Sequence, residues 1–213
     1  SADHPWPNLF IFIDSDVALS NVAIRIFGEN PVGSWSIGDF GPVNQFGAAI
    51  IVSGTESHFN VSHISLEGER SSTSPFGYNV FNGIYFEGYI TATGVDFLPL
   101  SGSYTVKNSS FKTLTWATPV ANIKDAVVVS SHNTYTDNEW GMDVADSVNS
   151  SVKIFNNHMD AMVAGGILLW NGLPENVNTD YLIRNNTITG PTGIALTQTM
   201  DAESTCLIKT NNL

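Results

Sequence analysis

One short pattern returns four times near the end of the chain, and it limits what the chain can fold into. Its copies are Val128–Tyr135, Val152–Met159, Tyr181–Ile188 and Cys206–Leu213, and the earlier window Tyr104–Phe111 has Ser in place of the shared Asn. The windows begin at residues 104, 128, 152, 181 and 206, so their starts lie 24, 24, 29 and 25 residues apart. A repeat of this length predicts supersecondary units stacked on one another.

The order of residue types inside the window predicts a short strand followed by a turn. The third position is mostly apolar and the eighth position always is. The sixth position holds Asn133, Asn157, Asn186 and Asn211. No helix explains an apolar alternation that stops at a fixed Asn, whereas a strand that ends in a turn does.

A second pattern lies between these windows. Gly141–Val144, Gly166–Leu169 and Gly193–Leu196 each read as Gly, apolar, variable, apolar, and Asn82–Phe86 holds an earlier copy. Each repeat therefore carries at least two short strands. About 24 residues are too few for a crossover helix in every repeat, so the strands should wind as a solenoid.

These two patterns together resemble right-handed parallel β-helix proteins of the pectate-lyase and polygalacturonase type. The resemblance implies an all-β, single-stranded parallel β-helix of about seven or eight coils that spans 1–213 as one domain. It also implies that Asn133, Asn157, Asn186 and Asn211 stack as an inward ladder. Loop excursions are expected near 28–46 and 67–80, where Gly, Pro and Ser interrupt the strands. The family includes lyases, hydrolases, epimerases, tailspikes and proteins without catalysis, so it implies architecture more narrowly than activity.

Composition excludes several classes of partner. A net charge of −12 argues against nucleic-acid binding, which requires a clustered basic surface. No run approaches the 18 apolar residues of a membrane span. The single cysteine, Cys206, excludes an internal disulfide, and a buried thiol is expected there.

Both ends of the chain break off inside the repeat pattern. Leu213 is the eighth position of a window, and no amphipathic helix caps either end. We therefore expect a segment of a longer chain, or ends that pair with other copies of the protein. Four glycosylation sequons begin at Asn60, Asn108, Asn149 and Asn185, but chance alone gives about as many in an Asn-rich chain.

Candidate binding residues come from the Gly-containing strands. Alternation turns their apolar positions inward and the residues between them outward, and the outward residues include Tyr85, Glu87, Asp143 and Trp170. In the β-helix enzymes that the chain resembles, the substrate lies along the outside of this sheet. The aromatic rings could pack against sugar rings, and the carboxylates of Asp143 and Glu87 could bind hydroxyls or act as acid and base. The alternative is an ordinary exposed strand face, which also carries some aromatic and acidic residues.

The polygalacturonase motifs are absent from the chain. Asn178-Thr-Asp180 matches one motif as a string but precedes the wrong strand, and Asn138–Gly141 stands where that motif belongs. No Asp-Asp pair occurs, and Leu207–Lys209 lacks the Arg of another motif. If the protein is an enzyme, it is a polysaccharide lyase or a glycoside hydrolase of another type.

Metal and cofactor signatures are also missing from the sequence. Asp14 and Asp16 are too few for a calcium loop, so calcium has no motif to support it and no cofactor is expected. His63, His132 and His158 are expected at different positions of their repeats, which argues against a shared metal site.

The sequence thus favours an extracellular or cell-surface protein that binds, or also processes, a polysaccharide or other glycan along an exposed parallel sheet. The alternative is a structural β-solenoid segment of a fibre, surface layer or adhesin without catalytic activity, which would associate end to end.

Overall fold

The computed structural model describes residues 10–26, 48–72, 77–80, 82–90, 97–170, 178–197 and 204–213, and in this part of the chain the fold is all-β, as predicted. The excursion expected at 28–46 lies outside the described residues. The one expected at 67–80 is described in part, and there Arg70 and Tyr78 form an antiparallel bridge. No helix in the described ranges is long and apolar enough to cross a membrane.

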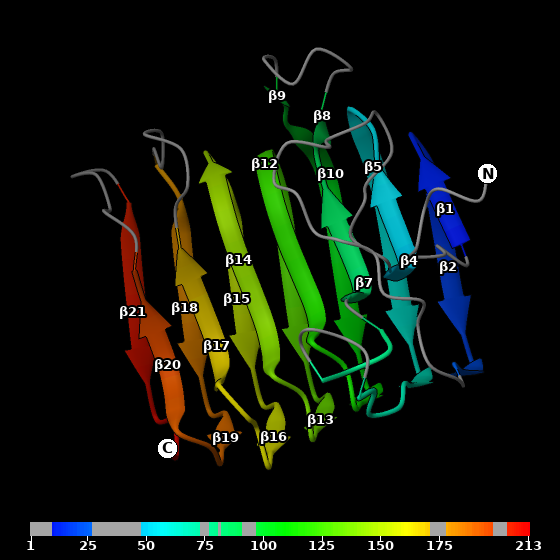
Figure 1. Ribbon diagram of the computed structural model, residues 1–213. Helices are drawn as coiled ribbons and strands as arrows, with labels where there is room; N and C mark the ends of the chain where they lie inside the picture. The colour runs from blue at the N-terminus through cyan, green and yellow to red at the C-terminus, as the bar shows by residue number, and fades with distance from the viewer. Residues whose placement is uncertain are drawn as a thin grey trace.

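The strands form three rows of parallel neighbours (Figure 1). Row 1 contains β1 (Phe10–Ile13), β4 (Ala48–Ser53), β7 (Asn82–Glu87), the first part of β12 (Trp116–Ser131), β14 (Trp140–Val148), β17 (Gly165–Trp170) and β20 (Thr192–Leu196). Row 2 contains β2 (Asp16–Ser20), β5 (Glu56–Ser62), β10 (Leu100–Lys107), the second part of β12, β15 (Ser151–Phe155), β18 (Asp180–Arg184) and β21 (Thr205–Lys209). Row 3 contains β3 (Ala23–Arg25), β6 (Ser65–Glu67), β11 (Ser110–Lys112), β13 (Thr134–Thr136), β16 (His158–Asp160) and β19 (Thr187–Ile188).

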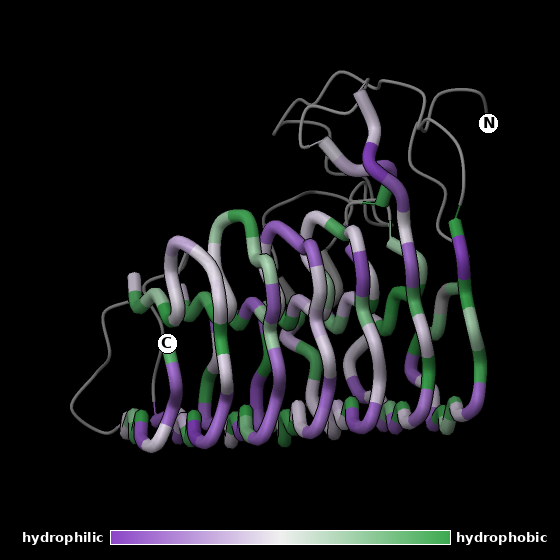
Figure 2. Tube along the Cα trace, turned by 90° about the horizontal axis from the view of Figure 1, so that it is seen from below, coloured by the Kyte–Doolittle hydropathy of each residue, from purple (hydrophilic) through white to green (hydrophobic). Residues whose placement is uncertain are grey.

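The chain visits the rows in a fixed order, from row 1 to row 2 to row 3, and then returns to row 1 beside the strand it left. Strand β12 is long enough to belong to rows 1 and 2, which joins both rows into one 13-stranded sheet. Figure 2 shows the successive circuits side by side. One antiparallel pair, β8 (Tyr89–Ile90) and β9 (Phe97–Leu98), interrupts this order between β7 and β10.

Apolar side chains of all three rows meet in one core, because strand alternation turns every second residue inward. In row 2, Tyr104, Val128, Val152 and Tyr181 occupy one register position and are all buried. Like residues therefore pack on like residues across neighbouring strands. In row 3 the rings of Phe111 and Tyr135 stack with centroids 5.2 Å apart.

A tight turn separates row 2 from row 3. It is made by one left-handed residue in each circuit, and these residues are Asn21, His63, Asn108, His132, Asn156, Asn185 and Thr210. Asn and His are among the side chains that tolerate this conformation best. The same turn follows each strand of row 2, so the chain enters row 3 at the same register position every time.

The residue after this turn is polar in the later circuits; it is buried except for Asn211, which is half-buried. The Oδ1 atoms of Asn133, Asn157, Asn186 and Asn211 each accept the backbone N–H of the residue one circuit earlier, over 2.9–3.0 Å. Their Nδ2 atoms donate to backbone carbonyls of row 2. The four side chains thereby satisfy backbone groups that the turn leaves without a ladder partner.

Similar polar side chains occur at the other two corners, and no repeated motif predicted them. Asn138 accepts from the Leu114 N–H and donates to the Phe111 carbonyl, after the row 3 strands. After row 1, the hydroxyl of Ser150 accepts from Ala126 N–H, and that of Thr179 accepts from Ser150 N–H. The side chains of Asn138, Ser150 and Thr179 thus have hydrogen-bond partners at these corners. The Nδ2 atom of Asn122 and the hydroxyl of Thr115, which are also buried there, have none among the described residues.

Cys206 lies in register with Tyr181 and is half-buried. Burial raises the pKa of its thiol above the ordinary value. The thiol therefore stays protonated at neutral pH, although it is half-buried where a buried thiol was expected.

Candidate functional site

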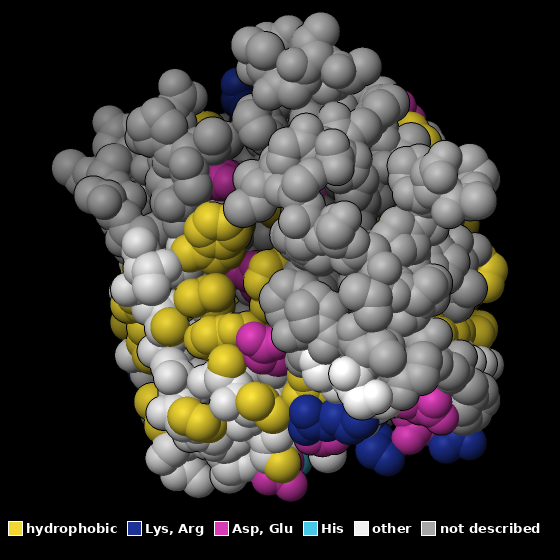
Figure 3. All heavy atoms as spheres, viewed as in Figure 1, with side chains coloured by type: hydrophobic (Ala, Val, Ile, Leu, Met, Phe, Trp, Pro, Cys, Tyr) yellow, Lys and Arg dark blue, Asp and Glu magenta, His cyan; other side chains and the backbone are white. Residues whose placement is uncertain are grey.

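The outward side of row 1 carries the side chains best suited to binding or catalysis, and we call it the row 1 face. It consists of Asn82, Tyr85, Glu87, Trp116, Trp140, Asp143 and Trp170. Tyr85 packs with Ala48 and Ile51 in a cluster separate from the main core, so these side chains lie on the opposite side of the sheet from it. Figure 3, in the view of Figure 1, shows hydrophobic and acidic side chains together on this side of the molecule.

The four predicted binding residues share this face and lie close to one another in register. Tyr85 and Glu87 alternate along β7, and Asp143 on β14 follows the position of Tyr85 two strands later, with Pro119 of β12 between them. Trp170 is in register with Ala145, two residues beyond Asp143.

One part of the prediction is wrong, because the face was expected to be exposed. Tyr85, Glu87 and Asp143 are only 8%, 5% and 4% exposed, and Trp170 is half-buried. Strand alternation shows on which side of a sheet a residue lies, but it does not show what packs against that side. The polar groups of this face are therefore largely desolvated, which strengthens their electrostatic interactions.

The acidic groups of the face act on one another. Burial first, and then the negative charge of Glu87 and a hydrogen bond to it, raise the pKa of the Tyr85 hydroxyl well above its ordinary value. Asp143 and Asp146 add to this shift. Tyr85 therefore remains a neutral hydroxyl at every physiological pH.

The carboxyl group of Asp143 has a strongly shifted pKa. Burial raises its pKa from 3.8 to about 7; a hydrogen bond from Trp170 opposes the rise and the charge of Asp146 adds to it. The bond from Trp170 is weak, since the indole N–H and Oδ1 of Asp143 have no partner of standard geometry among the described residues. A buried carboxyl with a pKa near neutrality and an open acceptor atom is typical of binding and acid–base sites.

Two aromatic residues of the face, Trp116 and Trp140, were missed by sequence reasoning. They are half-buried and in register with each other and with Gly165. A Cβ atom at Gly165 would collide with the Trp140 ring, so the indole lies over the bare backbone of β17. The position immediately before the Gly of each repeat would have revealed Trp140, whereas β12 lacks the Gly and gave no such signal.

Asn82, which also stands immediately before the Gly of its repeat, was missed like Trp140, and its surroundings are the most unusual of the face. It lies in register with Ala48 and Trp116, is fully buried, and neither of its amide atoms has a partner within the described residues. Together with Asp143 Oδ1 and Trp170 Nε1, it gives the face four buried polar atoms without partners. Because such atoms are costly in a folded protein, a concentration of them indicates a place where a ligand or water supplies the missing hydrogen bonds.

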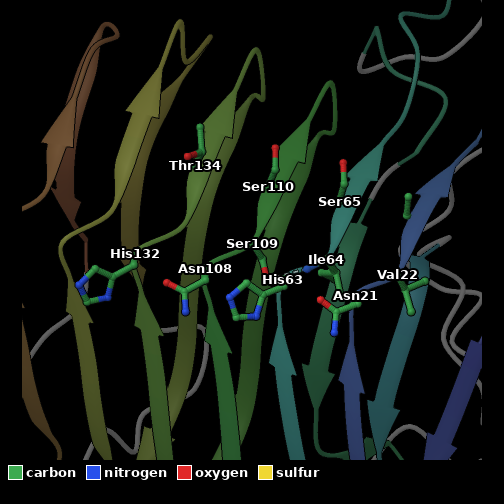
Figure 4. Close-up of a pocket in the computed structure, with 11 residues that line it drawn as sticks. Asn21, Val22, His63, Ile64, Ser65, Asn108, Ser109, Ser110, His132 and Thr134 are labelled. Carbon is green, nitrogen blue, oxygen red and sulfur yellow. Dashed lines mark hydrogen bonds between the residues drawn. The ribbon is translucent and has the colours of Figure 1, made fainter.

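A second concave surface lies at the corner between rows 2 and 3 (Figure 4). It has a volume of about 520 Å³ and is lined by the left-handed turn residues Asn21, His63, Asn108 and His132, with Ser and Thr hydroxyls on its other side. His63 and His132 share one turn position two circuits apart, so the expectation that these two histidines fall at different positions is wrong. His158 does lie elsewhere, on β16.

The turn conformation already explains the Asn and His residues of this corner groove, since it favours those side chains. All four sequon asparagines, including Asn108 in the groove, are exposed. The groove therefore gives less support for a ligand than the row 1 face, whose buried polar atoms have no such conformational explanation.

Among the described residues, no group of three or more His, Cys, Asp or Glu side chains is arranged to hold a metal ion. Comparisons of the chain with protein-family models, with curated proteins and with solved structures found no match.

Proposed function

We propose that the protein is a right-handed parallel β-helix, similar to the pectate-lyase type, that binds polysaccharide along the row 1 face. The parallel pairing of each strand with its counterpart one circuit later supports the winding. Connections between parallel strands are right-handed in nearly all proteins, which supports the hand. An extracellular or cell-surface location is part of this proposal, since polysaccharide is the ligand.

The observation that carries the binding proposal is the combination of aromatic rings with unpartnered buried polar atoms on one face. Trp116, Trp140 and Trp170 offer flat apolar surfaces of the kind that pack against sugar rings. Asn82 and Asp143 offer donors and acceptors at positions where water is largely excluded. Ligand sites commonly combine such apolar walls with a few polar groups that orient the ligand.

Affinity electrophoresis in gels that contain a soluble polysaccharide tests the proposal. The wild type should be retarded by at least one polymer of a panel, and Trp140→Ala should weaken that retardation by about tenfold, equivalent to about 1.4 kcal/mol. Phe155→Ala is the matched control, because Phe155 is a half-buried aromatic residue on the outward side of row 2. Equal retardation of the two variants would exclude the row 1 face as the binding site.

Catalysis on this face would involve Asp143 and Glu87. With a pKa of about 7, Asp143 holds a proton on a large fraction of molecules at neutral pH and could donate it to a leaving oxygen. The release of new reducing ends from a retarded polymer, and its loss in Asp143→Asn, would identify an enzyme. Binding without release would identify a binding protein.

A second candidate function, a structural segment that associates end to end, is favoured by the last circuit. Leu196 and Ile208 are 50% and 38% exposed, although their register partners Leu169 and Ile183 are fully buried. The edges of β20 and β21 could therefore pair with a second copy of the chain. Sedimentation should then show concentration-dependent association that Ile208→Lys abolishes; a monomer at every concentration would rule this function out.

A further inference from the structure

None of the residues that make up the row 1 face is basic. The chain has 8 Lys and Arg residues against 20 Asp and Glu. Seven of the eight basic residues lie on rows 2 and 3 or on connecting segments: Arg25, Arg70, Lys107, Lys112, Lys153, Arg184 and Lys209. The eighth, Lys124, is an exposed residue of β12 in register with Val148, at the end of the pairing between β12 and β14. In Figure 3 most of the visible Lys and Arg side chains gather at the lower edge of the molecule, below the row 1 face.

Acidic side chains, in contrast, gather on and beside the row 1 face. Glu87 and Asp143 belong to it, and Asp146 follows on β14. The negative charges of all three residues raise the pKa of the Tyr85 hydroxyl, so all three act on the same part of the face. An anionic ligand on this face would meet like charges in a desolvated setting and no basic residue among those that make up the face.

The hydrogen-bonding needs of the face point the same way. Asp143 is only 4% exposed, and its Oδ1 atom is an acceptor that has no donor among the described residues. A sugar hydroxyl can supply that donor and can also accept from the Trp170 indole. A carboxylate group accepts hydrogen bonds only, so it cannot satisfy the ionised form of Asp143.

We infer that the row 1 face selects uncharged, hydroxyl-rich polysaccharides and excludes polyuronates. This inference rests on the proposed function and names its ligand class. It departs from what the resemblance to pectate lyases alone suggests, because the polymer of those enzymes is a uronate chain.

Pairs of polymers that share a backbone and differ in charge provide the test. Hydroxyethyl cellulose is compared with carboxymethyl cellulose, and highly methyl-esterified pectin with the same pectin after removal of its esters. Affinity electrophoresis is run at low salt with a chelator, so that no divalent ion bridges two carboxylates. In every pair that binds, the uncharged member should bind at least tenfold more tightly.

The outcomes separate the two proposals. Equal or tighter binding of the anionic member overturns the inference on ligand class and leaves the proposed function standing. Retardation by no polymer of a broad panel overturns the proposed function itself, and the inference with it.

A charge variant adds a readout that a purely structural role of the acidic residues would not change. Asp146→Asn removes one negative charge beside the face and suits the left-handed backbone at that position. It should narrow the affinity ratio between the uncharged and the anionic polymer by a few-fold. Glu56→Gln, which neutralises an exposed acid on row 2, is the control and should leave the affinity ratio unchanged. At high salt, screening narrows the ratio for the wild type as well, so Asp146→Asn should then have no further effect on it.

Discussion

At the scale of one residue, Asp143 shows how burial raises the pKa of a carboxyl group. Its position on the outward side of β14 could be predicted from strand alternation, because Met142 and Val144 on either side are apolar. Its burial and its pKa of about 7 could not, since both depend on packing from other parts of the molecule. The same limit explains why Tyr85 and Glu87 were placed on the correct side of the sheet and yet were expected to be exposed.

The raised pKa of Asp143 predicts a specific pH dependence of stability. Because the folded-state pKa of about 7 lies above the reference value of 3.8, the folded protein retains a proton that the unfolded chain releases between these values. The stability contributed by that proton is complete below about pH 4 and is lost as the pH rises through about 7. Over that interval the wild type should lose up to about 4 kcal/mol relative to Asp143→Asn.

Urea unfolding of both proteins across this pH range measures the difference directly. Other acidic residues contribute equally to both proteins, so only the gap between the two curves reports on Asp143. Parallel curves, with a constant gap, would contradict the shifted pKa.

At the scale of the element, burial and not register position determines how much each apolar side chain contributes to stability. Ile183 of β18 and Ile208 of β21 are register partners with the same side chain, yet the first is fully buried and the second is 38% exposed. Ile183→Ala should therefore lower the free energy of unfolding by about 2–5 kcal/mol, because it leaves a cavity in the core. Ile208→Ala is the matched control and should cost clearly less, because much of its side chain is already in water. Equal decreases in the free energy of unfolding, measured by chemical denaturation, would mean that Ile208 of β21 is as well buried as Ile183 of β18.

The sequence revealed elements where their pattern was regular and missed them where it was not. The Gly-containing strands β14, β17 and β20 and the Asn-containing windows of row 2 were predicted from repeats. The row 1 part of β12 reads Ala117-Thr-Pro-Val120, without the Gly and with a proline, which is unusual inside a sheet. Because this strand was missed, its outward residue Trp116 was missed with it.

At the scale of the whole molecule, all-β structure with parallel strands follows from the sequence because one repeat length dominates residues 104–213. The first half repeats less regularly, and there the predicted excursion at 28–46 lies outside the described residues. At the corners, Asn138, Ser150 and Thr179 each accept a backbone N–H bond with different side chains. Because the residue type changes, no repeated motif predicts them. The hydrogen-bonding geometry of a turn can thus stay the same while the residue type changes.

Every inference about the row 1 face depends on the register in which successive circuits stack. A pair of cysteines tests that register directly, in a background where Cys206 is replaced by Ser. Thr105 and Val129 are register partners on the outward side of row 2. Neighbouring parallel strands lie about 4.8 Å apart, which is within the Cα separation of a disulfide, whereas Thr105 and Ser131 are about 8 Å apart by the same geometry.

Thr105→Cys with Val129→Cys should therefore form an intramolecular disulfide on mild oxidation, detected by peptide mass mapping. Thr105→Cys with Ser131→Cys should remain reduced under the same conditions. A disulfide in the second pair and none in the first would contradict the register, and with it the assignment of Asn82, Asp143 and the tryptophans to one ligand-binding face.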